Sequence, residues 1–179
     1  MHQIKKEAII IKKTIGIITF VILTAVIFNP PTVFGQFFFL ESEDIGKTVK
    51  DFTLKVVNGE EVNLEKYRDG KKTIIFFWAT WCPHCRAALE ELSKNKDAIE
   101  KKGIKIAPVD VGEKEEVVNK YLEKNAIEFS VFLDEKSEVA ETYELIGVPT
   151  FYFVNEDGIV TDVEHSLPKD LEKVFSKSS

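Results

Sequence analysis

Hydrophobic residues occur in short runs along the chain, and one run near its middle stops abruptly at a pair of cysteines. Residues 74–78 are consecutive branched or aromatic residues, which predicts a strand buried on both faces of a mostly parallel sheet. A helix is expected to follow, because Pro83 suits a first turn and a helical apolar pattern continues at Ala87, Ala88, Leu89 and Leu92. Cys82 and Cys85 therefore lie where a buried strand meets the start of a helix.

From residue 52 onward the pattern alternates between strand and helix. Two short apolar runs flank Asn58-Gly59, a dipeptide suited to positive φ, and predict a β-hairpin over residues 52–64. Ser166 is expected to cap a last helix, with Pro168 in its first turn. The remaining predicted helices are 83–101, 113–124 and 139–145, and the remaining strands are 104–110, 129–133, 151–154 and 159–163. This order predicts an α/β fold in which helices flank a central mixed β-sheet.

The N-terminal part of the chain has a different character. Residues 14–40 form a stretch of 27 positions without a charge, preceded by four lysines and followed by the acidic residues Glu41, Glu43 and Asp44. The lysines ahead of the apolar stretch predict that the N-terminus stays in the cytoplasm and that the rest of the chain lies outside it. Residues 1–40 are therefore expected to be a membrane anchor or a signal peptide, and residues 41–179 to form the folded domain.

The same segment leaves open whether it stays attached. Residues 15–28 have the length of a signal-peptide core, and Val33-Phe34-Gly35 offers a small-residue cleavage site. The apolar residues 37–40 favour an anchor, since a membrane interface accommodates aromatic side chains. We expect a single-pass anchor in the cell membrane; the alternatives are a secreted or periplasmic protein after cleavage, and a buried core helix. Both membrane readings place the domain in an oxidising compartment.

The charge of the chain limits the classes of partner that it can bind. The formal net charge is −6, of which residues 1–40 contribute +3, so the domain carries −9. An acidic domain without a basic stripe is repelled by phosphate, which excludes nucleic acid as a partner. We expect the domain to be a monomer.

The cysteine pair predicts redox chemistry. At a helix N-terminus Cys82 would face unpaired N–H groups and the positive end of the helix dipole, which stabilise a thiolate. A thiolate is the reactive form of cysteine, and Cys85, one turn later, can attack a mixed disulfide that Cys82 makes. A zinc site is disfavoured because the chain has only two cysteines and the scattered histidines His2, His84 and His165. An inert disulfide is disfavoured because it would close a very short loop. We expect no metal and no cofactor beyond a redox-active Cys82–Cys85 disulfide.

Two motifs in the sequence resemble those of a known family. Residues 78–85, W-A-T-W-C-P-H-C, resemble the active-site signature of the thioredoxin superfamily, and residues 146–150, I-G-V-P-T, resemble its second signature. Residues 41–179 are similar to the extracytoplasmic, TlpA-like (ResA-like) branch of that superfamily. The resemblance implies a thioredoxin-like fold with an N-terminal β-hairpin and a central α/β insertion. It also implies that Cys82 attacks a substrate and that Cys85 resolves the intermediate.

Several residues are candidates for tuning this chemistry. Pro83-His84 resembles the dipeptide of DsbA-type oxidases, and His84 can donate to the Cys82 thiolate or add a positive charge. The family's usual proton relays are missing, because Phe76 stands where thioredoxins place a buried acid and Ala88 where some TlpA-like reductases place a glutamate. Asp110, at the end of a strand predicted to neighbour the motif strand, is our candidate replacement.

The second signature supplies candidate substrate-binding residues. A cis Val148–Pro149 bond would bring this loop against the disulfide and expose the backbone of Val148 to an extended substrate. Thr150 completes the signature. Trp78 and Trp81 are both expected to be partly core and partly rim, and Trp81 is the better candidate for apolar substrate contact. His165 shows no partner in the sequence and is expected to be a surface residue.

These observations predict a membrane-tethered, extracytoplasmic thiol–disulfide oxidoreductase. Its substrates would be cysteine pairs in exported proteins, and a membrane redox partner would supply or accept electrons. The resemblance favours a reductase, because TlpA-like relatives commonly act as reductases, some of them in cytochrome c maturation. The Pro83-His84 dipeptide instead favours a DsbA-like oxidase. A thiol peroxidase is disfavoured because the chain lacks a Pro-x-x-x-Thr-x-x-Cys context, and a copper chaperone because the resembling proteins carry Cys-x-x-x-Cys.

Overall fold

A five-stranded mixed sheet forms the centre of the domain in the computed structural model, which describes residues 42–177. The strand order is β5-β4-β3-β6-β7, and a separate two-stranded hairpin joins β1 to β2. The strands are β1 (Thr53–Lys55), β2 (Glu61–Asn63), β3 (Lys72–Trp78), β4 (Ile104–Val111), β5 (Phe132–Asp134), β6 (Thr150–Val154) and β7 (Val160–Glu164). The helices are α2 (Leu64–Arg68), α3 (Pro83–Lys101), α4 (Glu115–Lys124), α5 (Glu138–Thr142) and α6 (Leu171–Phe175).

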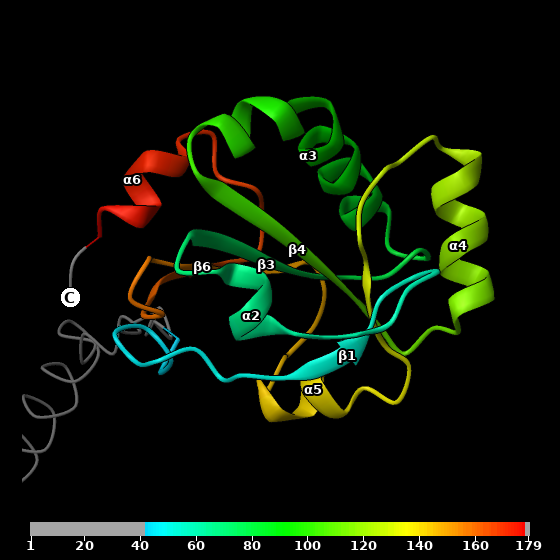
Figure 1. The fold of residues 1–179 in the computed structure, drawn as a ribbon, viewed down its shortest axis with the longest axis horizontal. Helices are drawn as coiled ribbons and strands as arrows, with labels where there is room; N and C mark the ends of the chain where they lie inside the picture. Colours follow the sequence, from blue (N-terminus) through cyan, green and yellow to red (C-terminus); the bar gives the residue numbers. More distant parts are fainter. Residues whose placement is uncertain (1–41, 178–179) are drawn as a thin grey trace, which may run out of the picture. The chain divides into compact units, whose positions relative to one another are not determined.

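The middle strand, β3, is paired along both edges and covered on both faces. It runs parallel to β4 and antiparallel to β6, and α3 lies across one face of the sheet while α2, β1 and α5 lie across the other (Figure 1). Alternate β3 residues enter two separate hydrophobic clusters, which explains why the sequence shows a continuous apolar run here. Trp78 is fully buried, so the expectation that it is partly exposed was wrong.

The predicted fold class is confirmed, including the mixed sheet, the N-terminal hairpin and the α4–β5 segment between the two halves of the sheet. Asn58 has a φ of 54°, as the turn dipeptide predicted. The long helix begins at Pro83 and ends at Lys101, at the predicted positions. These elements were predictable because their signals are local: turn chemistry, a helix-starting proline and an uninterrupted apolar run.

Several boundaries predicted from the sequence were wrong. Helix α4 begins at Glu115 rather than at residue 113, and α5 ends at Thr142 rather than at residue 145. The hairpin's second strand ends at Asn63, whose side chain caps the short helix α2, and Leu64 is buried as the first residue of that helix. Strand β5 begins only at Phe132, because the backbone of Val131 accepts a hydrogen bond from Val57 N instead. The last helix begins after Asp170, which caps it, while Leu167 packs against the core ahead of it.

The expectation of a membrane anchor or signal peptide concerns residues 1–40, which lie outside the described residues. Within residues 42–177, no helix combines the length and apolar character needed to cross a bilayer.

Candidate functional site

Cys82 occupies the N-cap of α3, as the sequence predicted. Its backbone is extended, and its sulfur accepts a hydrogen bond from the Cys85 backbone N–H at 3.2 Å. The side chain is almost buried, with 4% of its surface exposed. A sulfur held at this position lies at the helix end where backbone N–H groups are unpaired, and the Cys85 N–H is the donor that binds it.

Cys85 faces the protein interior. Both cysteines are free thiols in this structure, and Cys85 has no exposed surface. Burial raises the pKa of the Cys85 thiol well above its ordinary value, and the adjacent Cys82 raises it further. The two sulfurs are therefore unequal: Cys82 is placed to attack a partner, and Cys85 stays protonated until it is needed.

The loop that leads into Cys82 is held by an ionisable side chain. Thr80 donates from its backbone N–H to Glu113 at 2.5 Å and from its hydroxyl to the same carboxylate at 2.7 Å. Arg86 donates to the carbonyl of Thr80 at 3.3 Å. The sequence had suggested Glu113 as part of the first turn of a helix, but α4 begins at Glu115 and leaves Glu113 free to fix the loop.

Asp110 lies on the same face of the sheet as the cysteines. In the β3–β4 ladder it is paired with Trp78, which belongs to the core cluster that also contains Cys82 and Cys85. Asp110 is fully buried, and neither of its carboxylate oxygens has a hydrogen-bond partner within residues 42–177. Burial raises the pKa of Asp110 to about 8, and the nearby charge of Glu113 adds to the effect. The structure thus places a carboxyl group that can change its protonation near neutral pH in the layer behind the dithiol.

The two positions where relatives would carry acids are apolar here in structure as well as in sequence. Phe76 is buried and stacks on Phe151, with ring centroids 4.4 Å apart. Ala88 is buried on α3. With these positions filled by hydrocarbon, Asp110 is a buried carboxyl group on this face that lies on a strand next to β3.

The second signature folds against the first. The Val148–Pro149 peptide bond is cis, as predicted. The Val148 carbonyl oxygen lies 3.7 Å from the Cys82 sulfur, which donates to it. Thr150 is buried, and its hydroxyl donates to the Gly147 carbonyl at 2.7 Å, so this side chain braces the loop from within.

His165 is exposed, as expected, and the structure gives it two contacts that the sequence did not show. Its Nδ1 lies 3.2 Å from the Thr150 hydroxyl and 3.3 Å from the Pro149 carbonyl. The carbonyl can only accept, and the Thr150 hydroxyl uses its own hydrogen on Gly147, so Nδ1 carries the proton and donates. No sequence pattern signals this contact, because it joins the residue after β7 to Pro149 and Thr150, which lie at least 15 positions earlier.

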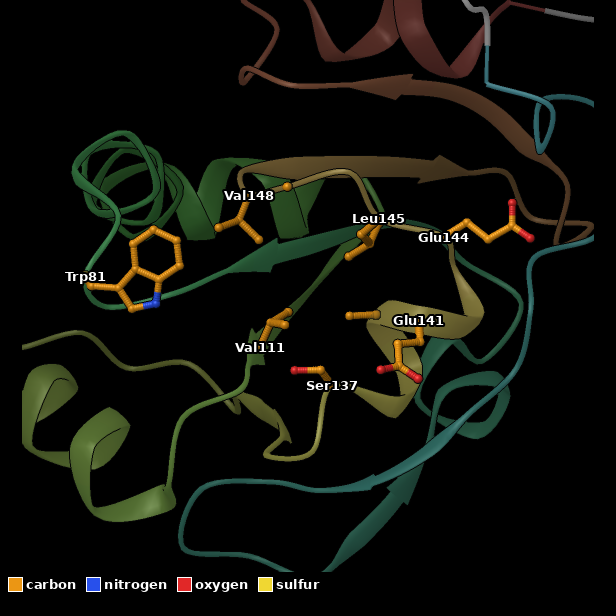
Figure 2. A pocket seen from close by; sticks show the side chains of 9 residues that line it. Trp81, Val111, Ser137, Glu141, Glu144, Leu145 and Val148 are labelled. Carbon is orange, nitrogen blue, oxygen red and sulfur yellow. The ribbon is translucent and has the colours of Figure 1, made fainter.

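Two pockets lie beside the dithiol. One has a volume of about 330 Å³ and is lined by residues that include Trp81, Val111 and Val148 (Figure 2). The other, of about 450 Å³, is lined by residues that include His84 and His165. Both His84 and Trp81 are exposed, Trp81 to 67%. No cluster of three or more metal-binding side chains occurs within residues 42–177.

The inequality of the two thiols generates a first prediction. Cys82 should react with iodoacetamide at least about tenfold faster than Cys85 at pH 7. Burial raises the pKa of the Cys85 thiol, and each unit of pKa lowers the thiolate fraction about tenfold. Cys85 also has no exposed surface. Mass spectrometry after timed quenching of the reduced protein measures both rates. The Cys82→Ser and Cys85→Ser variants serve as matched controls, and equal rates in these two single-thiol proteins would contradict the assignment.

A second prediction concerns His165. An Asn side chain can place its amide N–H near the position of Nδ1, whereas Gln places it farther out, near Nε2. His165→Asn should therefore retain the loop geometry and the rate of disulfide exchange, while His165→Gln and His165→Ala should lower kcat/KM by about fivefold, the value of one ordinary hydrogen bond. The Cys82–Cys85 reduction potential should stay unchanged in all three. Equal losses in the Asn and Gln variants would show that Nδ1 has no such role.

Comparisons with known proteins agree with this geometry. The sequence model of the AhpC/TSA family matches residues 45–163. Sporulation thiol-disulfide oxidoreductase A of Bacillus subtilis is 32% identical over 110 residues, covering 60% of this chain and 66% of that protein. Thiol-disulfide oxidoreductase ResA of Bacillus thuringiensis is 26% identical over 145 residues, covering 80% and 83% of the two chains.

Solved structures show the same similarity in three dimensions. The crystal structure of StoA from Bacillus subtilis superposes with a TM-score of 0.59 at 27% identity, covering 72% of this chain and 96% of that one. The thioredoxin domain of a thiol-disulfide oxidoreductase from Bacteroides vulgatus gives a TM-score of 0.65 at 27% identity, covering 75% and 100%. With its paired thiols at a helix N-terminus, this chain belongs to the AhpC/TSA family and is a thioredoxin-like thiol–disulfide oxidoreductase of the type of ResA and StoA.

Proposed function

We propose that this protein is a membrane-tethered, extracytoplasmic reductase of disulfides in exported proteins. The uncharged residues 14–40, with lysines before them and acids after them, support a tether with the domain outside the cytoplasm. Retention of the full chain in membranes after alkaline carbonate extraction would support the anchor, and release of a shortened chain would favour a cleaved signal peptide.

The reaction balances as an exchange of two electrons and two protons. The Cys82 thiolate attacks one sulfur of the substrate disulfide, the substrate S–S bond breaks, and the departing sulfur takes up a proton. Cys85 then loses its proton and attacks the Cys82 sulfur, which forms the Cys82–Cys85 disulfide and releases the second substrate thiol. A membrane redox partner must reduce this disulfide again before the next cycle.

The contacts of the Cys82 sulfur support a reductase rather than an oxidase. A strongly oxidising dithiol needs a heavily stabilised reduced form, as in DsbA. Here the described residues give the Cys82 sulfur one N–H donor, from Cys85, and His84 makes no hydrogen bond within residues 42–177. Cys85, with its raised pKa, adds no second stabilised thiolate. This single stabilising contact supports a reductase.

Cytochrome c maturation is a process that such a reductase would serve. Haem is attached to a Cys-x-x-Cys-His segment through two free thiols, so an exported apoprotein must be reduced first. An oxidised Cys-x-x-Cys-His peptide is therefore the substrate to try first.

We also propose that Asp110 accepts the proton of Cys85 during the resolving step. Its burial, its unpaired oxygens and its place on the cysteine face of the sheet support this role. A base whose pKa lies near the working pH is suited to move a proton from a thiol with a raised pKa.

The reduction potential of the pair tests the direction of the reaction. The full chain in detergent micelles, equilibrated with dithiothreitol and glutathione buffers, should show a potential at or below about −250 mV. His84→Ala should change it little, because His84 does not bond to the Cys82 sulfur. A value near about −120 to −150 mV would instead identify an oxidase. Peroxide consumption and tight Cu(I) binding by the reduced protein would identify the peroxidase and copper-chaperone alternatives.

Replacing Asp110 tests the proton acceptor. The carboxyl group ionises near pH 3.8 when unfolded and near pH 8 when folded, so folding takes up a proton between these values. The free energy of unfolding of wild type, measured relative to that of Asp110→Asn, should therefore fall as the pH rises from 4 to 8, by up to about 1.4 kcal/mol per pH unit. The variant should also resolve mixed disulfides at least about tenfold more slowly at pH 8.

Asp162→Asn is the matched control, because Asp162 is a buried acid on the edge strand β7, three strands away from β4, and is paired with Lys177. It should leave the resolving rate unchanged. Identical Cys85 reactivity in wild type and Asp110→Asn at every pH would remove Asp110 from the mechanism.

A further inference from the structure

The pocket beside Trp81 opens next to the attacking sulfur. Val148 lines it with its side chain, and the carbonyl oxygen of the same residue lies 3.7 Å from the Cys82 sulfur. In Figure 2 the Trp81 ring lies at one end of the lining residues and Glu141 and Glu144 lie toward the other end. The side chains of Val148, Val111, Ser137 and Leu145 lie between them. A polypeptide bound to Cys82 through a disulfide would therefore place a residue close to its own cysteine into this pocket.

The size and lining of the pocket suit a large apolar side chain. Its volume of about 330 Å³ lies within the range of small-molecule pockets, and its floor is formed by hydrocarbon. The apolar lining residues are Trp81, Val111, Ala140, Leu145 and Val148. Trp81 is 67% exposed and Ile146, in the adjoining loop, is 92% exposed, so apolar surface continues beyond the pocket mouth. Apolar surface left open beside a reactive thiol indicates a site for a partner.

The rim of the same pocket is negatively charged. Glu141 and Glu144 line it and are exposed, and neither carboxylate forms an ion pair or side-chain hydrogen bond within residues 42–177. The nearby cations do not neutralise them: Lys136 pairs with Glu138, and Lys50 pairs with Asp44. Residues 135–144 contain four glutamates and one lysine. The pocket thus combines an apolar floor with uncompensated negative charge.

We propose that this pocket selects substrate segments in which a bulky apolar residue and a lysine or arginine lie next to the reactive cysteine. The apolar side chain fills the pocket beside Trp81, and the cation lies within reach of Glu141 and Glu144. This specificity rests on the proposed disulfide reductase activity. Because the two glutamates are exposed, they act mainly by steering and orienting the segment, so the preference weakens with salt.

Four oxidised peptides of one length, each with the same cysteine pair, test the proposal. The two positions beside the first cysteine carry Leu-Lys, Leu-Glu, Ala-Lys or Ala-Glu. The measurement is kcat/KM for peptide reduction by the full chain in detergent micelles, with dithiothreitol as the electron source. At 20 mM salt the Leu-Lys peptide should exceed Leu-Glu by about fivefold, as expected for two exposed charge interactions, and the ratio should fall toward about twofold at 0.5 M salt. Leu-Lys should exceed Ala-Lys by about tenfold at either salt concentration.

Charge variants separate the rim from the overall acidity of the domain. The double variant Glu141→Gln, Glu144→Gln should reduce the Leu-Lys to Leu-Glu ratio to near one and keep the leucine preference. The control variant Glu90→Gln, Glu123→Gln removes the same charge from exposed helical positions that do not line this pocket, and should keep the wild-type ratio. A ratio lowered equally in both variants would assign the effect to net charge and overturn the proposal.

A small disulfide substrate distinguishes a failure of the pocket specificity from a failure of the reductase activity. Reduction of a small aromatic disulfide should be unaffected by the glutamate variants, because such a molecule needs only the Cys82 sulfur. If it is reduced while all four peptides react at one rate, the pocket assignment fails and the reductase activity stands. If no disulfide is reduced, the proposed function fails, and the specificity proposal fails with it.

Discussion

The structure depends on the burial of one strand on both faces. Because β3 is paired with β4 and β6 and covered by two apolar clusters, its last residue, Trp78, is fixed in the core. The chain leaves this strand at its carboxyl end, and α3 begins five residues later, at Pro83. The position of the Cys82 sulfur is therefore set by the sheet. The sulfur accepts a hydrogen bond from the backbone N–H of Cys85, so no other side chain is needed to hold it. In physical terms, the reactive group is positioned by backbone and burial.

Electrostatics around this junction follow from the same burial. Ionising a carboxyl group in an apolar layer is costly, so the pKa of Asp110 is raised above that of an exposed aspartate. The partly exposed Glu113 accepts both hydrogen bonds of Thr80. The acids are contributed by β4 and the turn after it, and β3 is apolar from Ile74 to Trp78. Phe76 stacked on Phe151 shows what that arrangement permits: a tightly packed layer directly behind the helix that carries the thiols.

The side that faces substrate is assembled from segments that are distant in sequence. The Gly147–Thr150 loop is braced from inside by the Thr150 hydroxyl and from outside by His165 on the segment after β7. On its other side, α5 brings Glu141 toward the pocket that Trp81 opens. The Cys82 sulfur therefore lies beside the Val148 carbonyl and next to an apolar pocket whose rim carries Glu141 and Glu144. These groups allow the site to distinguish one cysteine-containing segment from another.

The sequence by itself determined the parts of the protein whose causes are local. The apolar run at 74–78, the proline at the start of α3, the Asn58-Gly59 turn and the two signature motifs predicted the fold class, the two thiols and the loop that meets them. It placed Asp110 correctly at the end of the neighbouring strand, since parallel strands after one helix usually pair.

Only the tertiary structure decided the remaining features. Glu113 clamps Thr80, His165 donates to the Pro149 carbonyl, and residues from α5 complete the pocket, all through contacts between residues at least 15 positions apart. The starts of β5 and α6 were also set by what packs beside them, namely Val57 and the core around Leu167. Such contacts leave no periodic pattern in the chain, because their energy comes from side chains that meet only after the sheet has formed.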